Sequence, residues 1–274
     1  DLADADYQKM IELKPGETMG YMGIGRNANA QKRWDDAIKQ FDYVTKLAND
    51  YSSGYSFRAE SYIGKEEWTE ATDDIVKALS LDWDRKALYL ANTLKEPAFT
   101  MLVSKIKVQS AKSPNEATWP YITGTMYEQS KQYTKAIEYY ETANSKDVSP
   151  VIHQRISECH YELGDYEDAL NSINQALNLD STDLSYKARK ANIYYEMGNV
   201  KSAIAEWDNV LEAQPEYGFG YYRRGWFKEL AGDMEGAIED LSMSIVLDPE
   251  YSYAYVSRGD VYMKQGKKEL AEAD

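Results

Sequence analysis

A small residue and a large apolar residue four positions later recur along the chain, a spacing that places both on one face of an α-helix. The small residue is alanine at Ala3, Ala37, Ala71, Ala136, Ala169, Ala203, Ala237 and Ala271. The large residues that follow are Tyr7, Phe41, Ile75, Tyr140, Ile173, Trp207 and Leu241. Successive alanines are 33 or 34 residues apart, except for a gap of 65 residues between Ala71 and Ala136. The sequence is therefore an internal repeat with a period of about 34 residues.

A second set of small residues, twelve positions before the alanines, predicts another helix in each period. The set is Gly25, Ala59, Gly124, Ser157, Ala191, Gly225 and Gly259. Small side chains let two helices approach closely, and the large apolar residues fill the space between successive pairs. Glycines mark the turn between the two helices at Gly164, Gly198, Gly232 and Gly266. Each period thus predicts two antiparallel helices, and the whole chain predicts an all-α fold.

This pattern resembles the tetratricopeptide repeat family, whose 34-residue unit is a helix–turn–helix pair. The resemblance extends over nearly the whole chain, because several independent positions keep one register. It implies an all-α, right-handed superhelical solenoid of about seven to eight tetratricopeptide helix-turn-helix repeats, one of them degenerate. It also implies that the first helix of each pair lines a concave groove in which extended peptides bind.

We expect residues 1–274 to form a single tetratricopeptide repeat solenoid. The expected units are 1–16 (second helix of a preceding repeat), 18–51, 52–82, 83–116 (degenerate), 117–149, 150–183, 184–217, 218–251 and 252–274 (truncated). In the degenerate unit Leu102 takes the alanine position, Ile106 follows four residues later, and Pro97 lies at the turn between the helices. Both ends fall inside a repeat, so we expect the native protein to extend further, certainly past the C-terminus.

The composition argues against two classes of partner. The chain has 31 Lys and Arg against 46 Asp and Glu, a formal net charge of −15, which repels nucleic acid. The mean hydropathy is −0.65, and no run approaches the roughly 18 apolar residues of a membrane-spanning helix. We therefore expect a soluble protein with no nucleic-acid partner and no membrane span. The compartment stays open: cytoplasmic or, if Asp1 is a processed N-terminus, exported or periplasmic.

The sequence predicts no catalytic, cofactor or metal site. Cys159 is the single cysteine, so a zinc site with four thiolates is absent. His153 and His160 are seven residues apart on one helix, which is about 10 Å along its axis and too far to share a metal. The many carboxylates single out no catalytic pair. We expect a protein that is not an enzyme.

Three arginines keep the period of the repeat and are candidates for ligand contact. Arg155, Arg189 and Arg223 are 34 residues apart, and each precedes the small packing residue by two positions, so they point away from the second helix. The resemblance places that face in the concave groove. Arginines beside aromatic rings suit a carboxylate, a phosphate or a peptide backbone. The candidate ligand-binding residues are Arg155, Arg189, Arg223, Asn192, Trp226, Tyr222, Tyr195 and Tyr121.

Ion pairing between and within repeats is the alternative interpretation of these arginines. Arg155 has Glu158 three residues later and Glu162 seven residues later, and Arg189 has Glu196 seven residues later. A second basic series lies one position nearer the alanines, and we expect it to be structural, with packed stems and heads that reach acids of the next helix. This series is Arg58, Lys190, Arg224 and Arg258.

Some members of the family hold a C-terminal carboxylate in a clamp of two Lys, two Asn and one Arg. Only Arg223 matches that clamp here. Gln154 and Phe219 stand where Lys is expected, and Glu158 and Arg189 stand where Asn is expected.

We therefore expect a non-enzymatic scaffold that binds a protein or an extended peptide on the concave face of the first helices. Two alternatives stay open. The chain is the targeting or regulatory arm of a larger enzyme or sensor that extends beyond the C-terminus, or it is a structural solenoid that assembles with itself end to end.

Overall fold

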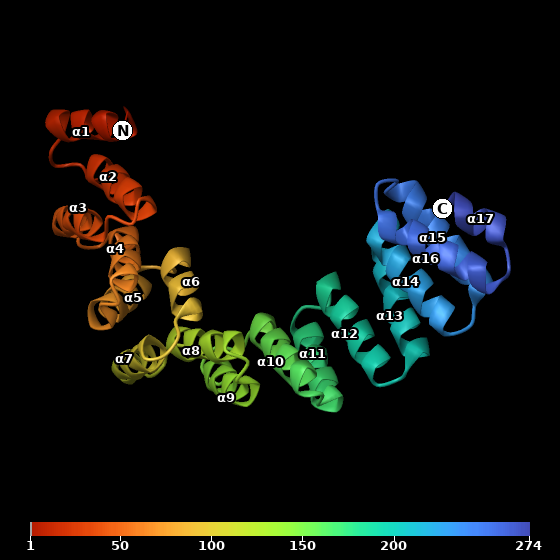
Figure 1. Cartoon of the computed structure of the whole chain (residues 1–274). Helices are drawn as coiled ribbons and strands as arrows, with labels where there is room; N and C mark the ends of the chain where they lie inside the picture. Colours follow the sequence, from red (N-terminus) through yellow and green to blue (C-terminus); the bar gives the residue numbers. More distant parts are fainter. Residues whose placement is uncertain (1) are drawn as a thin grey trace. The chain divides into compact units, whose positions relative to one another are not determined.

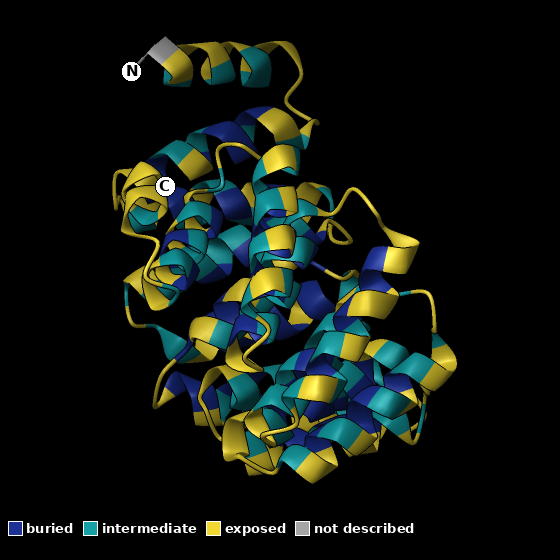
Figure 2. Ribbon diagram, turned by 90° about the vertical axis from the view of Figure 1, so that its right-hand side faces the viewer, coloured by how far each residue is buried: buried dark blue, intermediate teal, exposed yellow. Residues whose placement is uncertain are grey.

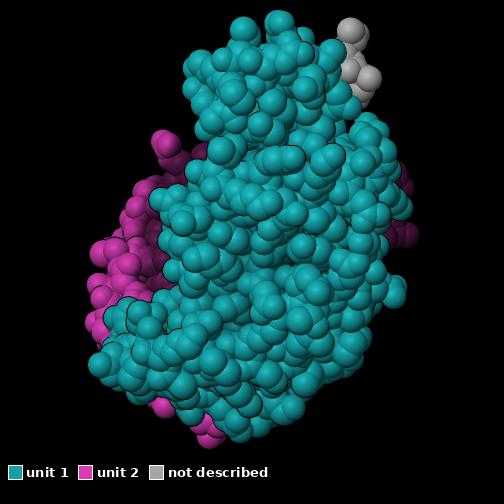
Figure 3. All heavy atoms as spheres, turned by 90° about the vertical axis from the view of Figure 1, so that its left-hand side faces the viewer, with its two compact units in different colours: residues 1–147 teal, residues 148–274 magenta. Residues whose placement is uncertain are grey.

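The computed structural model describes residues 2–274, and this part of the chain forms 17 α-helices and no strand (Figure 1). Asp1, and with it the question of a processed N-terminus, lies outside the described residues. The all-α fold and the two helices in each period are confirmed. The chain divides into two compact units, residues 1–147 and 148–274 (Figure 3). That the two units continue as a single solenoid stays a prediction.

Unit 1 contains four pairs of antiparallel helices after a first, single helix. Its helices are α1 (Leu2–Leu13), α2 (Thr18–Ala30), α3 (Trp34–Leu47), α4 (Ser52–Gly64), α5 (Trp68–Leu81), α6 (Arg85–Thr93), α7 (Ala98–Lys112), α8 (Thr118–Gln129) and α9 (Tyr133–Asn144). The degenerate repeat is α6 and α7. Pro97 immediately precedes α7, and Leu102 and Ile106 are buried as expected, but α6 is a short helix of 9 residues.

Unit 2 contains four further pairs. Its helices are α10 (Pro150–Leu163), α11 (Tyr166–Leu179), α12 (Leu184–Glu196), α13 (Val200–Ala213), α14 (Gly218–Leu230), α15 (Met234–Leu247), α16 (Ser252–Lys264) and α17 (Lys268–Ala273). The predicted glycine turns are confirmed. Gly164, Gly198, Gly232 and Gly266 all have a positive φ between 75° and 84°, which a side chain would disfavour.

The repeated alanine and apolar positions form the core of each unit, as predicted. Within a unit, buried residues line the helix faces that turn toward neighbouring helices (Figure 2). The alanines of the complete pairs and the large residues four positions later are no more than 1% exposed. Ala3 in α1 is exposed and Ala271 in α17 is half-buried. The period of the sequence therefore reports the packing of helix on helix.

Close approach of the paired helices explains the small residues. A Cβ atom added at Gly25 would lie 2.6 Å from Phe41 Cε1, and one at Gly225 would lie 3.0 Å from Leu241 Cγ. Real Cβ atoms do not come so near without a shift of their neighbours. Glycine at these positions thus sets the distance between the helices.

The second basic series is structural, as expected. The Arg58 guanidinium donates to Asp74 on α5 at 2.7 and 2.8 Å, and to Asp42 on α3 at 2.7 Å. Arg224 repeats this arrangement with Asp240 on α15 and Asp208 on α13. Each arginine thus joins its own pair of helices to the preceding pair, which the sequence alone did not indicate.

Candidate functional site

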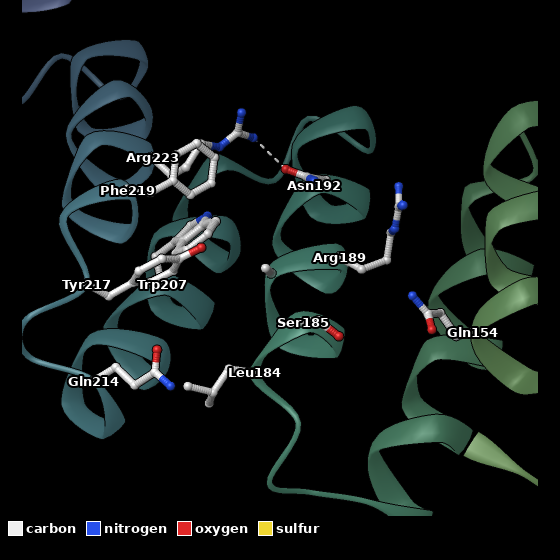
Figure 4. A pocket seen from close by; sticks show the side chains of 11 residues that line it. Gln154, Leu184, Ser185, Arg189, Asn192, Trp207, Gln214, Tyr217, Phe219 and Arg223 are labelled. Carbon is white, nitrogen blue, oxygen red and sulfur yellow. Dashed lines mark hydrogen bonds between the residues drawn. The ribbon is translucent and has the colours of Figure 1, made fainter. Parts of the chain in front are cut away.

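A pocket of about 400 Å³ lies in unit 2 among α10, α12, α13 and α14 (Figure 4). Helix α12 contributes most of its wall, because Ser185, Arg189 and Asn192 recur at the spacing of one helix face. Phe219 and Arg223, one turn apart, come from α14 in the same way. The complete lining is Gln154, Leu184, Ser185, Ala188, Arg189, Asn192, Trp207, Gln214, Tyr217, Phe219 and Arg223.

The charge of the pocket is positive although the chain as a whole is acidic. Arg189 and Arg223 line it, and no lining residue is acidic. Glu158, on α10 near the pocket, accepts a hydrogen bond from Arg189 Nη2 at 3.0 Å and lies 3.3 Å from Arg155 Nη1. One carboxylate thus serves two members of the arginine series. Arg189 also lies over the Tyr161 ring, 5.7 Å from its centroid.

Arg223 differs from the other two arginines because no acidic side chain in residues 2–274 pairs with it. Its Nη2 donates to Asn192 Oδ1 at 2.5 Å, the bond drawn in Figure 4. Its guanidinium lies 5.2 Å from the Trp226 ring centroid and 5.3 Å from that of Phe227. Burial lowers the pKa of Arg223 from its ordinary value, because the charged form loses water that no carboxylate replaces.

Aromatic rings surround the Arg223 side chain. Tyr195 packs on Trp226 with ring centroids 5.0 Å apart, so it supports the ring beneath the guanidinium. Tyr222 packs edge-on against Tyr251 at 5.1 Å. These contacts fix the aromatic residues in place and limit the positions that Arg223 can adopt.

The structure brings most of the predicted site residues together. Arg189, Asn192 and Arg223 line the pocket, and Trp226, Tyr195 and Tyr222 belong to the aromatic rings around Arg223. Arg155 lies beside Glu158 and does not line the pocket.

Tyr121 is the exception among the predicted residues, because it belongs to unit 1. Its ring packs against Trp83 and Tyr140, with centroids 5.9 and 5.6 Å apart. We describe it as part of that aromatic group.

Ion pairing accounts for part of the arginine series, but the partners differ from those expected. Arg189 pairs with Glu158 of the preceding repeat instead of Glu196, which accepts a hydrogen bond from Tyr161 Oη at 3.2 Å. Helix geometry explains the difference, because a residue seven positions away is two turns along the axis.

Sequence reasoning missed the floor and one end of the pocket. Trp207 was assigned to the core, and it is indeed 1% exposed, yet it also lines the pocket from the second helix of its pair. Gln214 and Tyr217 come from the connection between α13 and α14. No periodic signal marks such residues, because a connection between helices has no repeating face.

Within the described part of the chain, no group of three or more His, Cys, Asp or Glu side chains could hold a metal ion. His153 and His160 both lie on α10, and burial lowers the pKa of His153. Among residues 2–274, no helix combines the length and apolar character needed to cross a membrane.

Comparison with known proteins agrees with the repeat fold. Family models of the tetratricopeptide repeat match residues 121–145, 151–183 and 188–252. The TPR repeat-containing protein YpiA of Bacillus subtilis is 25% identical over 194 residues, which cover 67% of this chain and 45% of that protein. The U-box domain-containing protein 70 of Oryza sativa subsp. japonica is 29% identical over 93 residues, covering 34% of this chain and 12% of that protein. The chain therefore spans less than half the length of either relative.

Solved structures show the same fold. A crystal structure of MamA protein has a TM-score of 0.52 and 20% identity, covering 57% of this chain and 86% of that one. MamA from Desulfovibrio magneticus RS-1, residues 41 to the end, also has a TM-score of 0.52, with 19% identity and coverage of 57% and 89%. The protein is a helical repeat protein of paired antiparallel helices. It belongs to the tetratricopeptide repeat family.

Proposed function

We propose that unit 2 is a binding scaffold that holds an extended segment of a protein or peptide against α10, α12 and α14. The observation that carries the proposal is Arg223, a half-buried cation that pairs with no carboxylate in the described chain. The chain has 46 acidic residues against 31 basic ones, and its structural arginines, such as Arg58 and Arg224, each have two aspartates. An arginine without an acid is therefore one whose partner comes from outside the chain.

The surroundings of Arg223 suit a peptide. Asn192 holds one nitrogen of the guanidinium, and Trp226 lies beneath its plane, so the side chain is preorganised and loses little freedom on binding. Phe219 and Tyr217 line the pocket and are 41% and 39% exposed, so they offer apolar contacts to a bound segment. The pocket thus combines a charged anchor with aromatic walls, which is the composition of an interface centre.

Selection of peptides from a random display library on the full chain tests this proposal. We expect selected peptides to bind the wild-type protein in fluorescence anisotropy and to lose about tenfold or more in affinity with Arg223→Glu. Lys201→Glu is the matched control, because this exposed α13 residue does not line the pocket and its substitution makes the same change in net charge. Circular dichroism checks that the helices remain.

Equal loss of affinity in both variants would attribute the effect to net charge alone and contradict the proposal. Failure to select any peptide would contradict it as well. The targeting arm of a larger protein and end-to-end self-association stay predictions.

A further inference from the structure

The floor of the pocket contains a hydrogen-bond donor without an acceptor. Trp207 is 1% exposed, and its indole Nε1 is buried with no hydrogen-bond partner among residues 2–274. Buried polar groups are nearly always paired, so an unpaired indole N–H beside a cavity needs an explanation. The Trp207 ring packs edge-on against Phe219, with centroids 6.3 Å apart, which holds the indole in this position.

The other polar groups around the cavity are also rich in donors. Arg223 contributes a guanidinium, and the Asn192 carbonyl oxygen is already used by it, which leaves the Asn192 amide hydrogens. Gln214 and Tyr217 add an amide and a hydroxyl at the end of the pocket shown in Figure 4. With two arginine side chains and no acid on its walls, the pocket favours a ligand group that accepts hydrogen bonds and has a negative charge.

The amount of unbalanced charge selects among such groups. Arg189 shares the carboxylate of Glu158, so Arg223 is the cation of the pocket with no anionic partner in the described chain. A carboxylate has a single charge and matches one guanidinium. A phosphate has a charge near −2 and would need a second free cation. A neutral carbonyl would leave Arg223 unbalanced.

We propose that the pocket is a carboxylate-binding site in which Arg223 pairs with the acid and Trp207 Nε1 donates to an oxygen of the same ligand. This inference rests on the proposed binding function of unit 2 and names the group that the pocket recognises. Trp207 is then the specificity-determining residue, because it makes a core ring of the fold also a reader of the ligand.

Nuclear magnetic resonance of the indole N–H groups tests the site directly in the full chain. The chain has six tryptophans, and the signal of Trp207 is identified by its loss in Trp207→Phe. The probe is N-acetylglutamic acid α-amide, whose one carboxylate is on the side chain. We expect a saturable downfield shift of the Trp207 signal, while Trp34, Trp68, Trp83 and Trp119 of unit 1 stay unchanged.

Two related probes separate the sources of the carboxylate and the role of its charge. N-acetylglutamine α-amide has the same shape without the charge and should leave the Trp207 signal unmoved. N-acetylglycine presents a terminal carboxylate, so a shift with this probe alone would assign the site to a chain end instead of a side chain. Either carboxylate result supports the proposal. No shift with either acid, or equal shifts with the glutamine derivative, would overturn it.

Selected peptides give a second, independent readout. In the wild-type protein, replacing the acidic residue of the peptide that enters the pocket by its amide should lower affinity about tenfold or more. Trp207→Phe, which keeps the ring and removes the donor, should reduce the affinity for the acidic peptide and so narrow that preference. Trp119→Phe, a buried tryptophan of unit 1, is the matched control and should retain it.

The two proposals fail in different ways. Peptides that bind through Arg223 with no preference for an acid would overturn the carboxylate site and leave the scaffold function intact. Absence of Arg223-dependent peptide binding would overturn the scaffold function itself. If Trp207→Phe fails to fold by circular dichroism, the titration of the wild-type chain still decides the question.

Discussion

Two neighbouring arginines on α14 have opposite environments. Arg224 donates to both oxygens of Asp240 at 2.7 Å and to Asp208 at 2.8 Å, and these hydrogen bonds raise its pKa despite burial. Arg223 has an amide and two aromatic rings as partners, and burial lowers its pKa. The difference shows that one side of α14 is completed by the fold, whereas the other leaves a charge available to a ligand.

The same contrast extends along the repeats. The Arg224 position recurs as Arg58 in unit 1 and as Arg258 in α16, and both donate to an aspartate sixteen residues later. The Arg223 position recurs as Arg189, which is paired with Glu158. A position whose partner is part of the repeat is structural, and the member of a series that lacks the partner is where function is to be sought.

The largest expected effect is on the side of α14 that faces α15. Gly225→Leu places a side chain where even a Cβ would meet Leu241 Cγ at 3.0 Å and the Ala237 carbonyl at 3.2 Å. We expect a loss of about 3 kcal/mol, because overpacking forces the two helices apart. Hydrogen exchange of the α14 and α15 amides measures it locally.

Gly259→Leu sharpens that prediction. A Cβ at Gly259 would lie 3.5 Å from the Ala271 carbonyl, an ordinary contact, so the loss should be smaller than at Gly225. Equal losses at both positions would contradict the packing assigned to Gly225.

An intermediate effect is expected from Arg224→Ala. Asp240 is 4% exposed and would keep Lys228 Nζ, 2.9 Å away, but lose its bidentate partner. We expect a loss of about 2 kcal/mol in local stability of α14 and α15, because a buried carboxylate is left with poorer compensation. Peptide affinity should change little. A large loss of affinity without loss of stability would show that the two sides of α14 are not separate.

The smallest effect is expected from Glu158→Gln. This change removes the carboxylate that serves both Arg155 and Arg189, so the positive charge around the pocket increases. We expect the affinity for an acidic peptide to rise about threefold at low salt and the gain to shrink as salt is added. Titrations at two salt concentrations measure it, and an unchanged or weaker affinity would place Glu158 outside the electrostatics of the site.

The sequence predicts the fold well because the same contacts recur. Ala203 and Trp207, or Ala237 and Leu241, pack as their counterparts do in other repeats, so the period reveals the core and the turns. It predicts the phase of Arg223 for the same reason. It does not reveal that Arg189 is neutralised by the preceding repeat and Arg223 is not, because that depends on which residue occupies one position of the neighbouring first helix: Glu158 beside Arg189, but Asn192 beside Arg223.

The pocket itself was beyond sequence reasoning for a related cause. Trp207 is at once a core residue by its position and a pocket residue by its Nε1 atom, and periodicity reports only the first. Gln214 and Tyr217 lie in a connection whose course is set by tertiary packing.

The central claim is that Arg223 serves a ligand and Arg224 serves the fold. The most direct test measures, for Arg223→Ala, both the local stability of α14 by hydrogen exchange and the affinity for a selected peptide, beside Arg224→Ala. The account predicts that Arg223→Ala changes stability by no more than about 0.5 kcal/mol and weakens binding by about tenfold or more. A loss of stability like that of Arg224→Ala, with peptide affinity unchanged, would contradict it.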